Sequence, residues 1–121
     1  MAKILIVDDS PTDIHVIETI LVNAGHEVFS VDSGEKAIEV AQKQNPDLIL
    51  MDIIMPGLNG FQATRMLSKD PETSSIPVVI LTTKNMETDR VWGLRQGAKE
   101  FLIKPPSKNT LLSTIDTCLA A

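Results

Sequence analysis

The sequence has few of the residues that build disulfides, zinc sites or aromatic clusters. Its 121 residues include one cysteine, Cys118, two histidines and no tyrosine, and aromatic residues make up only 3%. A single cysteine excludes a disulfide within the chain and fits a reducing compartment. Whatever chemistry this chain supports must therefore come from other side chains.

Long apolar runs are also missing. The N-terminus begins MAKILIV and then turns acidic, which is too short an apolar stretch for a signal peptide, and no segment approaches the length of a membrane span. The formal net charge of −5 makes the chain a poor match for nucleic acid or an anionic membrane. We therefore expect a cytoplasmic protein with no nucleic-acid partner and no membrane insertion.

What the sequence does contain is a regular alternation. Five short apolar runs, rich in β-branched residues, alternate with segments of helical spacing: ILIV (4–7), VFSV (28–31), LILM (48–51), VVIL (78–81) and FLI (101–103). Strands that alternate with helices predict a parallel sheet covered on both faces. The prediction is one α/β domain over residues 1–121, a doubly wound (βα)5 sandwich with a five-stranded parallel sheet.

Local patterns place some of the helix ends. The stretch SPTD at 10–13 is typical of a helix start, with Ser10 as N-cap and Asp13 reaching back as a capping partner. Asn59 and Ser107 are predicted caps of later helices. Trp92, in the fourth predicted helix, is interpreted as a half-buried packing residue.

Acidic, basic and hydroxyl side chains follow the predicted strands. Asp8 and Asp9 end the first strand, Asp52 the third, Thr82 and Thr83 the fourth, and Lys104 the fifth. Ligands of open α/β sheets bind outside the carboxyl ends of the strands. We therefore expect these side chains to meet at one edge of the sheet.

Each of these residues alone has an ordinary interpretation. Asp9 can cap a helix, Asp52 can be a solvated loop residue, and Lys104 can be a surface charge. Together, however, three crowded carboxylates would repel one another unless a cation neutralises them. Oxygen ligands favour a hard cation such as Mg²⁺, with Mn²⁺ as a substitute, and the strand ends carry no Cys or His for zinc or copper. One Mg²⁺ and Lys104 would balance the three carboxylates.

These motifs closely resemble the receiver domain of two-component response regulators, of which the single-domain chemotaxis regulator CheY is the type example. The resemblance covers the whole chain and is carried by Asp8-Asp9, by Asp52 in LILMDIIMPGLNG, by Thr82 in VVILTT and by Lys104-Pro105 in FLIKP. The stretch TTKNMETDRVWGLRQGAKEFLIKP further resembles PilH-type regulators of twitching motility and phototaxis. The family implies a flavodoxin-like fold with strand order 2-1-3-4-5 and, here, a stand-alone receiver without an output domain.

The resemblance also implies roles for single residues. Asp52 would be the phosphoacceptor, and Asp8, Asp9, Asp52 and the backbone carbonyl of Ile54 would hold Mg²⁺. Lys104 and Thr82 would contact the phosphoryl group, and Lys104–Pro105 would be a cis peptide bond. The chain departs from the common family pattern at three positions: the switch aromatic is Phe101 rather than Tyr, residue 83 is Thr where a smaller residue is usual, and Pro106 follows the Lys-Pro pair.

The function implied is that of a phosphoprotein in a phosphorelay, not an enzyme with a separate substrate. A CheA-like histidine kinase would phosphorylate Asp52, and the domain would phosphorylate and dephosphorylate itself slowly. The signal would pass to a downstream protein of pilus motility or taxis through the surface of the fourth helix, fifth strand and fifth helix. Otherwise the domain would serve as a phosphate sink for its kinase, or would bind partners without turnover of phosphate.

Two other functions use similar parts. A phosphohydrolase of the haloacid-dehalogenase type also has an aspartate nucleophile and Mg²⁺, but it needs a second acid two residues after the nucleophile, where this chain has Ile54. A flavodoxin-like FMN carrier shares the topology. It would need a phosphate cradle after the first strand, where Asp8 and Asp9 would repel a phosphate.

Overall fold

Five strands and five helices alternate along residues 1–120, the part of the chain that the computed structural model describes. The elements are β1 (Lys3–Val7), α1 (Pro11–Asn23), β2 (Glu27–Val31), α2 (Gly34–Gln44), β3 (Leu48–Met51), α3 (Gly60–Lys69), β4 (Val78–Thr82), α4 (Glu87–Arg95), β5 (Glu100–Ile103) and α5 (Lys108–Ala120). The strands form one parallel sheet in the order β2-β1-β3-β4-β5, which confirms the predicted fold class. Within this range, none of the helices combines the length and apolarity needed to cross a membrane.

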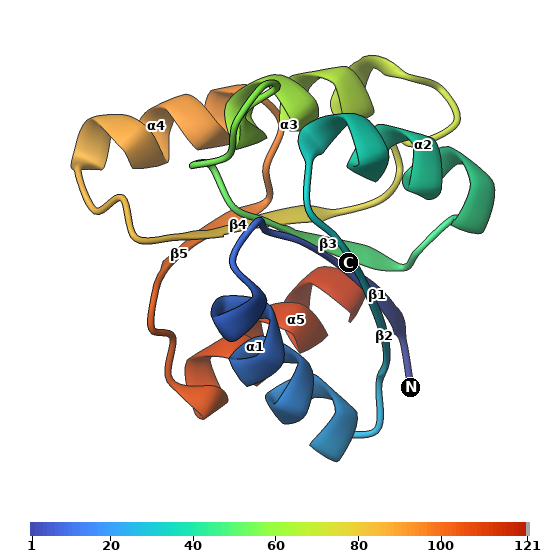
Figure 1. Cartoon of the computed structure of the whole chain (residues 1–121), viewed down its shortest axis with the longest axis vertical. Coiled ribbons are helices and arrows are strands. Elements are labelled where there is room, and N and C mark those ends of the chain that lie inside the picture. The colour runs from blue at the N-terminus through green and yellow to red at the C-terminus, as the bar shows by residue number, and fades with distance from the viewer. Residues whose placement is uncertain (121) are drawn as a thin grey trace.

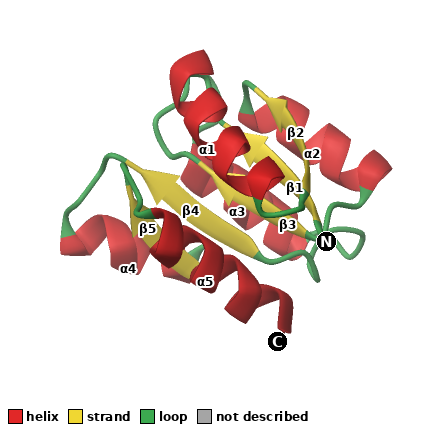
Figure 2. Ribbon diagram, turned by 90° about the horizontal axis from the view of Figure 1, so that it is seen from below, coloured by secondary structure: helices red, strands yellow, loops and turns green. Residues whose placement is uncertain are grey.

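The sheet is the middle of three layers. Helices α1 and α5 cover one face, and α2, α3 and α4 cover the other (Figure 1). In the view from below, α1 and α5 lie in front of the strands (Figure 2). Alternate residues of β1 fill the two interfaces: Ile4 and Ile6 join the core beneath α1 and α5, while Leu5 and Val7 join the core beneath α2 and α3. Both faces are therefore apolar, which explains the continuous apolar runs in the sequence.

The three predicted N-cap residues, Ser10, Asn59 and Ser107, each cap a helix. The Ser10 hydroxyl accepts a hydrogen bond from the Asp13 backbone N–H at 3.3 Å, and Asn59 forms a capping box with Gln62. The Ser107 hydroxyl accepts from the Thr110 N–H at 3.0 Å. These bonds satisfy backbone donors that the first turn of a helix leaves free, so each helix starts at a defined residue.

Helix α4 approaches the sheet unusually closely because its buried position is a glycine. A Cβ atom added to Gly93 would lie 2.6 Å from Cδ1 of Ile80 and 3.2 Å from Cδ2 of Phe101. Next to it, the side chain of Trp92 is 50% exposed. Trp92 is therefore half-buried, as predicted, and the inward-facing position of this helix turn belongs to Gly93.

The close approach predicts the effect of Gly93→Ala. Alanine favours a helix over glycine by up to about 1 kcal/mol. Overpacking a tight contact costs about 1–3 kcal/mol, so we expect a net loss of about 1 kcal/mol in the free energy of unfolding, measured by urea denaturation. Thr88→Ala, at an exposed position of α4, is the control and should be nearly neutral. A Gly93→Ala protein as stable as the parent would show that this contact does not hold α4.

Candidate functional site

The carboxyl ends of four strands bring the predicted residues to one edge of the sheet. Val7 pairs with Met51 and Thr82 pairs with Ile103, so the residues that follow these strands lie beside one another. The Asp52 N–H donates to the Val7 carbonyl at 2.9 Å, and the Lys104 N–H donates to the Thr82 carbonyl at 2.8 Å. The backbone hydrogen bonds of the sheet thus continue past the strand ends and fix the backbone of Asp52 and Lys104.

Three carboxylates meet at this edge. One oxygen of each of Asp8, Asp9 and Asp52 lies within 4.8 Å of the others. Asp8 and Asp52 are 3% and 8% exposed, whereas Asp9 is open to solvent. Oxygen donors at this spacing suit a hard divalent cation, which accepts carboxylates and water together.

Backbone amides orient the two buried carboxylates. Asp8 Oδ1 accepts from the Ser10 N–H at 2.9 Å, and Asp52 Oδ1 accepts from the Ile54 N–H at 3.3 Å. In both residues the other oxygen accepts from the Lys104 ammonium. In both Asp8 and Asp52, therefore, Oδ1 binds a backbone amide and Oδ2 binds the ammonium group of Lys104.

The Lys104 ammonium binds three carboxylates in the site. Its Nζ donates to Asp8, to Asp13 at 2.9 Å and to Asp52 at 3.2 Å, and its side chain is only 8% exposed. The contact with Asp13 contradicts the prediction that this carboxylate reaches back to cap α1. The Ser10 N–H that it would have accepted from is taken by Asp8, and the Asp13 side chain turns to the lysine instead.

The site holds more negative than positive charge. Burial would lower the pKa of Lys104, but the hydrogen bonds that its ammonium donates to Asp8 and Asp13 and the charge of Asp52 raise the pKa well above its ordinary value. Burial raises the pKa of Asp8, and the bonds from Lys104 and Ser10 offset this only in part. One ammonium group faces several carboxylates. The lysine is therefore stabilised in its charged form, whereas the carboxylates around it share this one positive charge.

The other predicted residues occupy separate places around this cluster. Thr82 is fully buried, and its hydroxyl accepts from the Lys84 N–H at 3.4 Å. Thr83 is exposed and lines a cleft of about 220 Å³ beside Lys104. The Lys104–Pro105 peptide bond is cis. Phe101 does not join the cluster, because its half-buried ring lies on the α4 side of the sheet, against the small core of Ile53, Ile80 and Ala98.

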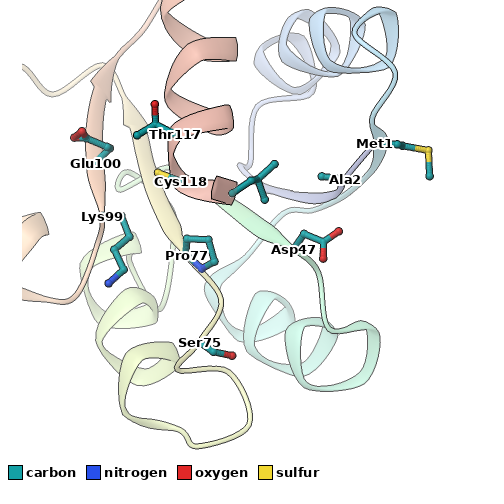
Figure 3. A pocket seen from close by; sticks show the side chains of 10 residues that line it. Met1, Ala2, Asp47, Ser75, Pro77, Lys99, Glu100, Thr117 and Cys118 are labelled. Carbon is teal, nitrogen blue, oxygen red and sulfur yellow. The ribbon is translucent and has the colours of Figure 1, made fainter. Parts of the chain in front are cut away.

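A larger cavity, of about 770 Å³, lies at the opposite edge of the sheet (Figure 3). It is lined by Ala2, Asp47, Pro77 and Lys99, each of which immediately precedes a strand. Cys118 also lines it, and burial raises the pKa of this thiol, which favours its protonated form. The chemistry-bearing cluster is therefore at the carboxyl edge, although the cavity there is smaller.

Comparisons with known proteins point to one family. The family described as the response regulator receiver domain matches residues 4–116. Protein PilH of Pseudomonas aeruginosa is 56% identical over 99% of both chains. The structure of the chemotaxis protein CheY4 of Vibrio cholerae superposes with a TM-score of 0.90 at 33% identity, over 98% of both chains.

A further solved structure bears on the acidic cluster. The receiver domain of a sensor histidine kinase from Pseudomonas aeruginosa matches with a TM-score of 0.92 at 32% identity, over 99% of this chain and 98% of that one. That structure holds a magnesium ion coordinated in its active site cleft. The geometry of the described residues makes the carboxyl edge of this sheet the candidate site.

Proposed function

This chain belongs to the response regulator receiver-domain family, and from that premise we propose that it is a stand-alone phosphoacceptor in a two-component phosphorelay. The observation that carries the proposal is the convergence of Asp52, two further carboxylates and Lys104 at one edge of the sheet. A buried carboxylate next to a fixed ammonium can act as a nucleophile toward an electrophilic phosphorus.

The proposed reaction is the transfer of a phosphoryl group from a histidine of a CheA-like kinase to Asp52. A carboxylate oxygen of Asp52 attacks phosphorus, an O–P bond forms, and the N–P bond of the phosphohistidine breaks. The other ring nitrogen of the phosphohistidine carries a proton, so when the first nitrogen keeps the electron pair of the broken bond, the imidazole leaves as a neutral ring. Such transfers depend on positioning and charge stabilisation, and Asp52 is positioned by its bonds to Val7, Ile54 and Lys104.

The carboxylates of Asp8, Asp9 and Asp52 fit a magnesium ion, and the backbone carbonyl of Ile54 is the fourth proposed protein ligand. Bound there, Mg²⁺ would offset the charge of the phosphoryl oxygens, and Mn²⁺ would do the same. The excess of carboxylates over ammonium groups is the local reason for a divalent cation. Asp9, the exposed member, is the ligand with the freest access to a hydrated ion.

Lys104 and Thr82 would recognise the phosphoryl group after transfer. The Lys104 ammonium already contacts Oδ2 of Asp52, so it lies close to where the new oxygens would be. Thr82 ends β4 beside it, and its hydroxyl could exchange the long bond from Lys84 for a bond to a phosphoryl oxygen. Thr83 would narrow the path by which a phosphate donor approaches Asp52 from the solvent.

A movement of Phe101 would transmit the phosphorylation of Asp52 to the surface of the domain. Phe101 pairs with Ile80 in the sheet, three residues before Lys104, and its ring contacts Gly93 of α4. When the Thr82 hydroxyl turns to the phosphoryl group, the space it leaves would allow the Phe101 ring to move further inward. The surface of α4, β5 and α5 would then change for a downstream protein.

The likeness to PilH supports a role in pilus-based motility or taxis. Within that role the domain would be either an output regulator or a phosphate sink for its kinase. Four apolar side chains, 40–65% exposed, lie on β5, on α4 or just before α4: Met86, Val91, Trp92 and Ile103. They favour the output regulator, because exposed apolar side chains suit a protein partner. An aspartate-based phosphohydrolase is disfavoured, because Ile54 stands where its second acid would be.

The first prediction concerns the acceptor. Incubation with acetyl phosphate and Mg²⁺ should add one phosphoryl group, seen by intact-mass spectrometry and released by hydroxylamine. Asp52→Asn should abolish the adduct, and removal of Mg²⁺ by EDTA should prevent it. Asp47→Asn, at the other end of the same strand, is the matched control and should keep the adduct. An adduct that persists in Asp52→Asn would refute the assignment of the acceptor.

The second prediction concerns the readout. Beryllofluoride with Mg²⁺, standing in for the phosphoryl group, should shift the NMR signals of Phe101 and of residues 84–95 and 101–115, and shift α2 far less. Thr82→Ala should bind beryllofluoride with an affinity within about tenfold of the parent, since one hydroxyl hydrogen bond contributes about 0.5–1.5 kcal/mol net. In that variant Phe101 should no longer respond, whereas Thr83→Ala should behave like the parent. An equal Phe101 response in Thr82→Ala would rule out the coupling.

A further inference from the structure

The third partner of Lys104 comes from helix α1, outside the set of carboxylates that fit a cation. Asp13 Oδ2 lies 2.9 Å from Lys104 Nζ, closer than Asp52 at 3.2 Å. Its side chain is 42% exposed, against 5% for Asp8 and 10% for Asp52. Asp13 therefore approaches the ammonium from the solvent side, while Asp8 and Asp52 approach it from within.

Asp13 is held in this position by the start of α1. Its backbone N–H donates to the Ser10 hydroxyl, and the Ser10 N–H donates to Asp8, so the first turn of α1 is tied to the site. The carboxylates that meet within 4.8 Å are Asp8, Asp9 and Asp52, and Asp13 is not among them. Asp13 can thus affect phosphorylation of Asp52 in two ways: through its contact with Lys104, or as a more distant negative charge near the cation site.

The three donors of the ammonium are divided among Asp8, Asp13 and Asp52. When oxygens of Asp8 and Asp52 turn to a cation and a phosphoryl group, Asp13 is the carboxylate that can stay with the lysine. Without it, the ammonium would draw closer to Asp8 and Asp52 and would compete with the cation for their oxygens. A buried ammonium always needs such a partner, because its charge is costly to leave unpaired.

We propose that Asp13 is a positioning residue, whose carboxylate holds the Lys104 ammonium on the α1 side and so limits its competition with the cation for Asp8 and Asp52. The role rests on the proposed function of Asp52 and Lys104. The contact differs from an ordinary surface ion pair such as Lys36–Asp32, whose side chains are 62% and 65% exposed, because Lys104 itself is almost fully buried.

The first arm of the test uses the metal-free protein. NMR of the lysine ammonium groups should give a slowly exchanging Lys104 signal, since its three protons are hydrogen-bonded and shielded from water. Asp13→Asn should shift this signal and speed its exchange with water, and Asp13→Glu should restore most of it. Glu18→Gln is the matched control: Glu18 lies on α1 and carries the same charge, but within residues 1–120 it is not a partner of Lys104.

The second arm measures the Mg²⁺ affinity by titration of backbone NMR signals. Asp13→Asn should raise the Kd for Mg²⁺ by roughly two- to fivefold, the range expected from a partly exposed ion pair. In the Lys104→Met background the same substitution should have no further effect, because it acts through the lysine. Phosphorylation by acetyl phosphate should be slower in Asp13→Asn at low Mg²⁺ and return to the parent rate at saturating Mg²⁺.

The outcomes separate this inference from the proposed function. An unchanged Lys104 signal in Asp13→Asn would overturn it, and this arm decides the matter even if Lys104→Met does not fold. An equal loss of Mg²⁺ affinity with and without Lys104 would also overturn it, because Asp13 would then act as a distant charge. A parent protein that acetyl phosphate does not phosphorylate would refute the proposed function instead, whatever the Lys104 signal does.

Discussion

The ion cluster around the Lys104 ammonium is the interaction on which the rest of the site depends. It links β5 to β1, β3 and α1, because its three partners come from the ends of two strands and from the first turn of a helix. Burying carboxylates together is costly, and one shared cation offsets the cost only in part. The remaining negative charge is what makes the carboxyl edge of this sheet a place for a divalent cation and an electrophilic phosphoryl group.

The same edge connects the chemistry to a distant surface. Thr82 and Lys104 end neighbouring strands, and Phe101 lies three residues before the lysine on β5. Gly93 lets α4 rest directly on Ile80 and Phe101, so a small movement of the ring would be felt by the helix. Trp92, exposed beside this contact, would carry the change to the surface. A tightly packed contact passes on small displacements because it has no free volume to absorb them.

Much of this arrangement was predictable from the sequence, for identifiable reasons. Short apolar runs indicated all five strands, and the rule that ligands bind at the carboxyl ends of parallel strands grouped Asp8, Asp52 and Lys104 from the sequence alone. The contact between Asp13 and Lys104 was not predictable, because an acid three residues after Ser10 has the same pattern whether it caps the helix or reaches a lysine 91 residues away. That Gly93 takes the inward-facing position of α4 was not predictable either, because helix periodicity does not show which position a glycine opens to the core.

The measurement that tests this account most directly is the free energy of unfolding of Lys104→Met in the metal-free protein. Removing the ammonium leaves buried carboxylates without their shared partner, so we expect a loss of roughly 3 kcal/mol or more, part of which Mg²⁺ should recover. Lys84→Met, which removes an exposed lysine after the neighbouring strand, should leave the stability nearly unchanged. A Lys104→Met protein as stable as the parent, with no added response to Mg²⁺, would contradict the claim that this ammonium holds the site together.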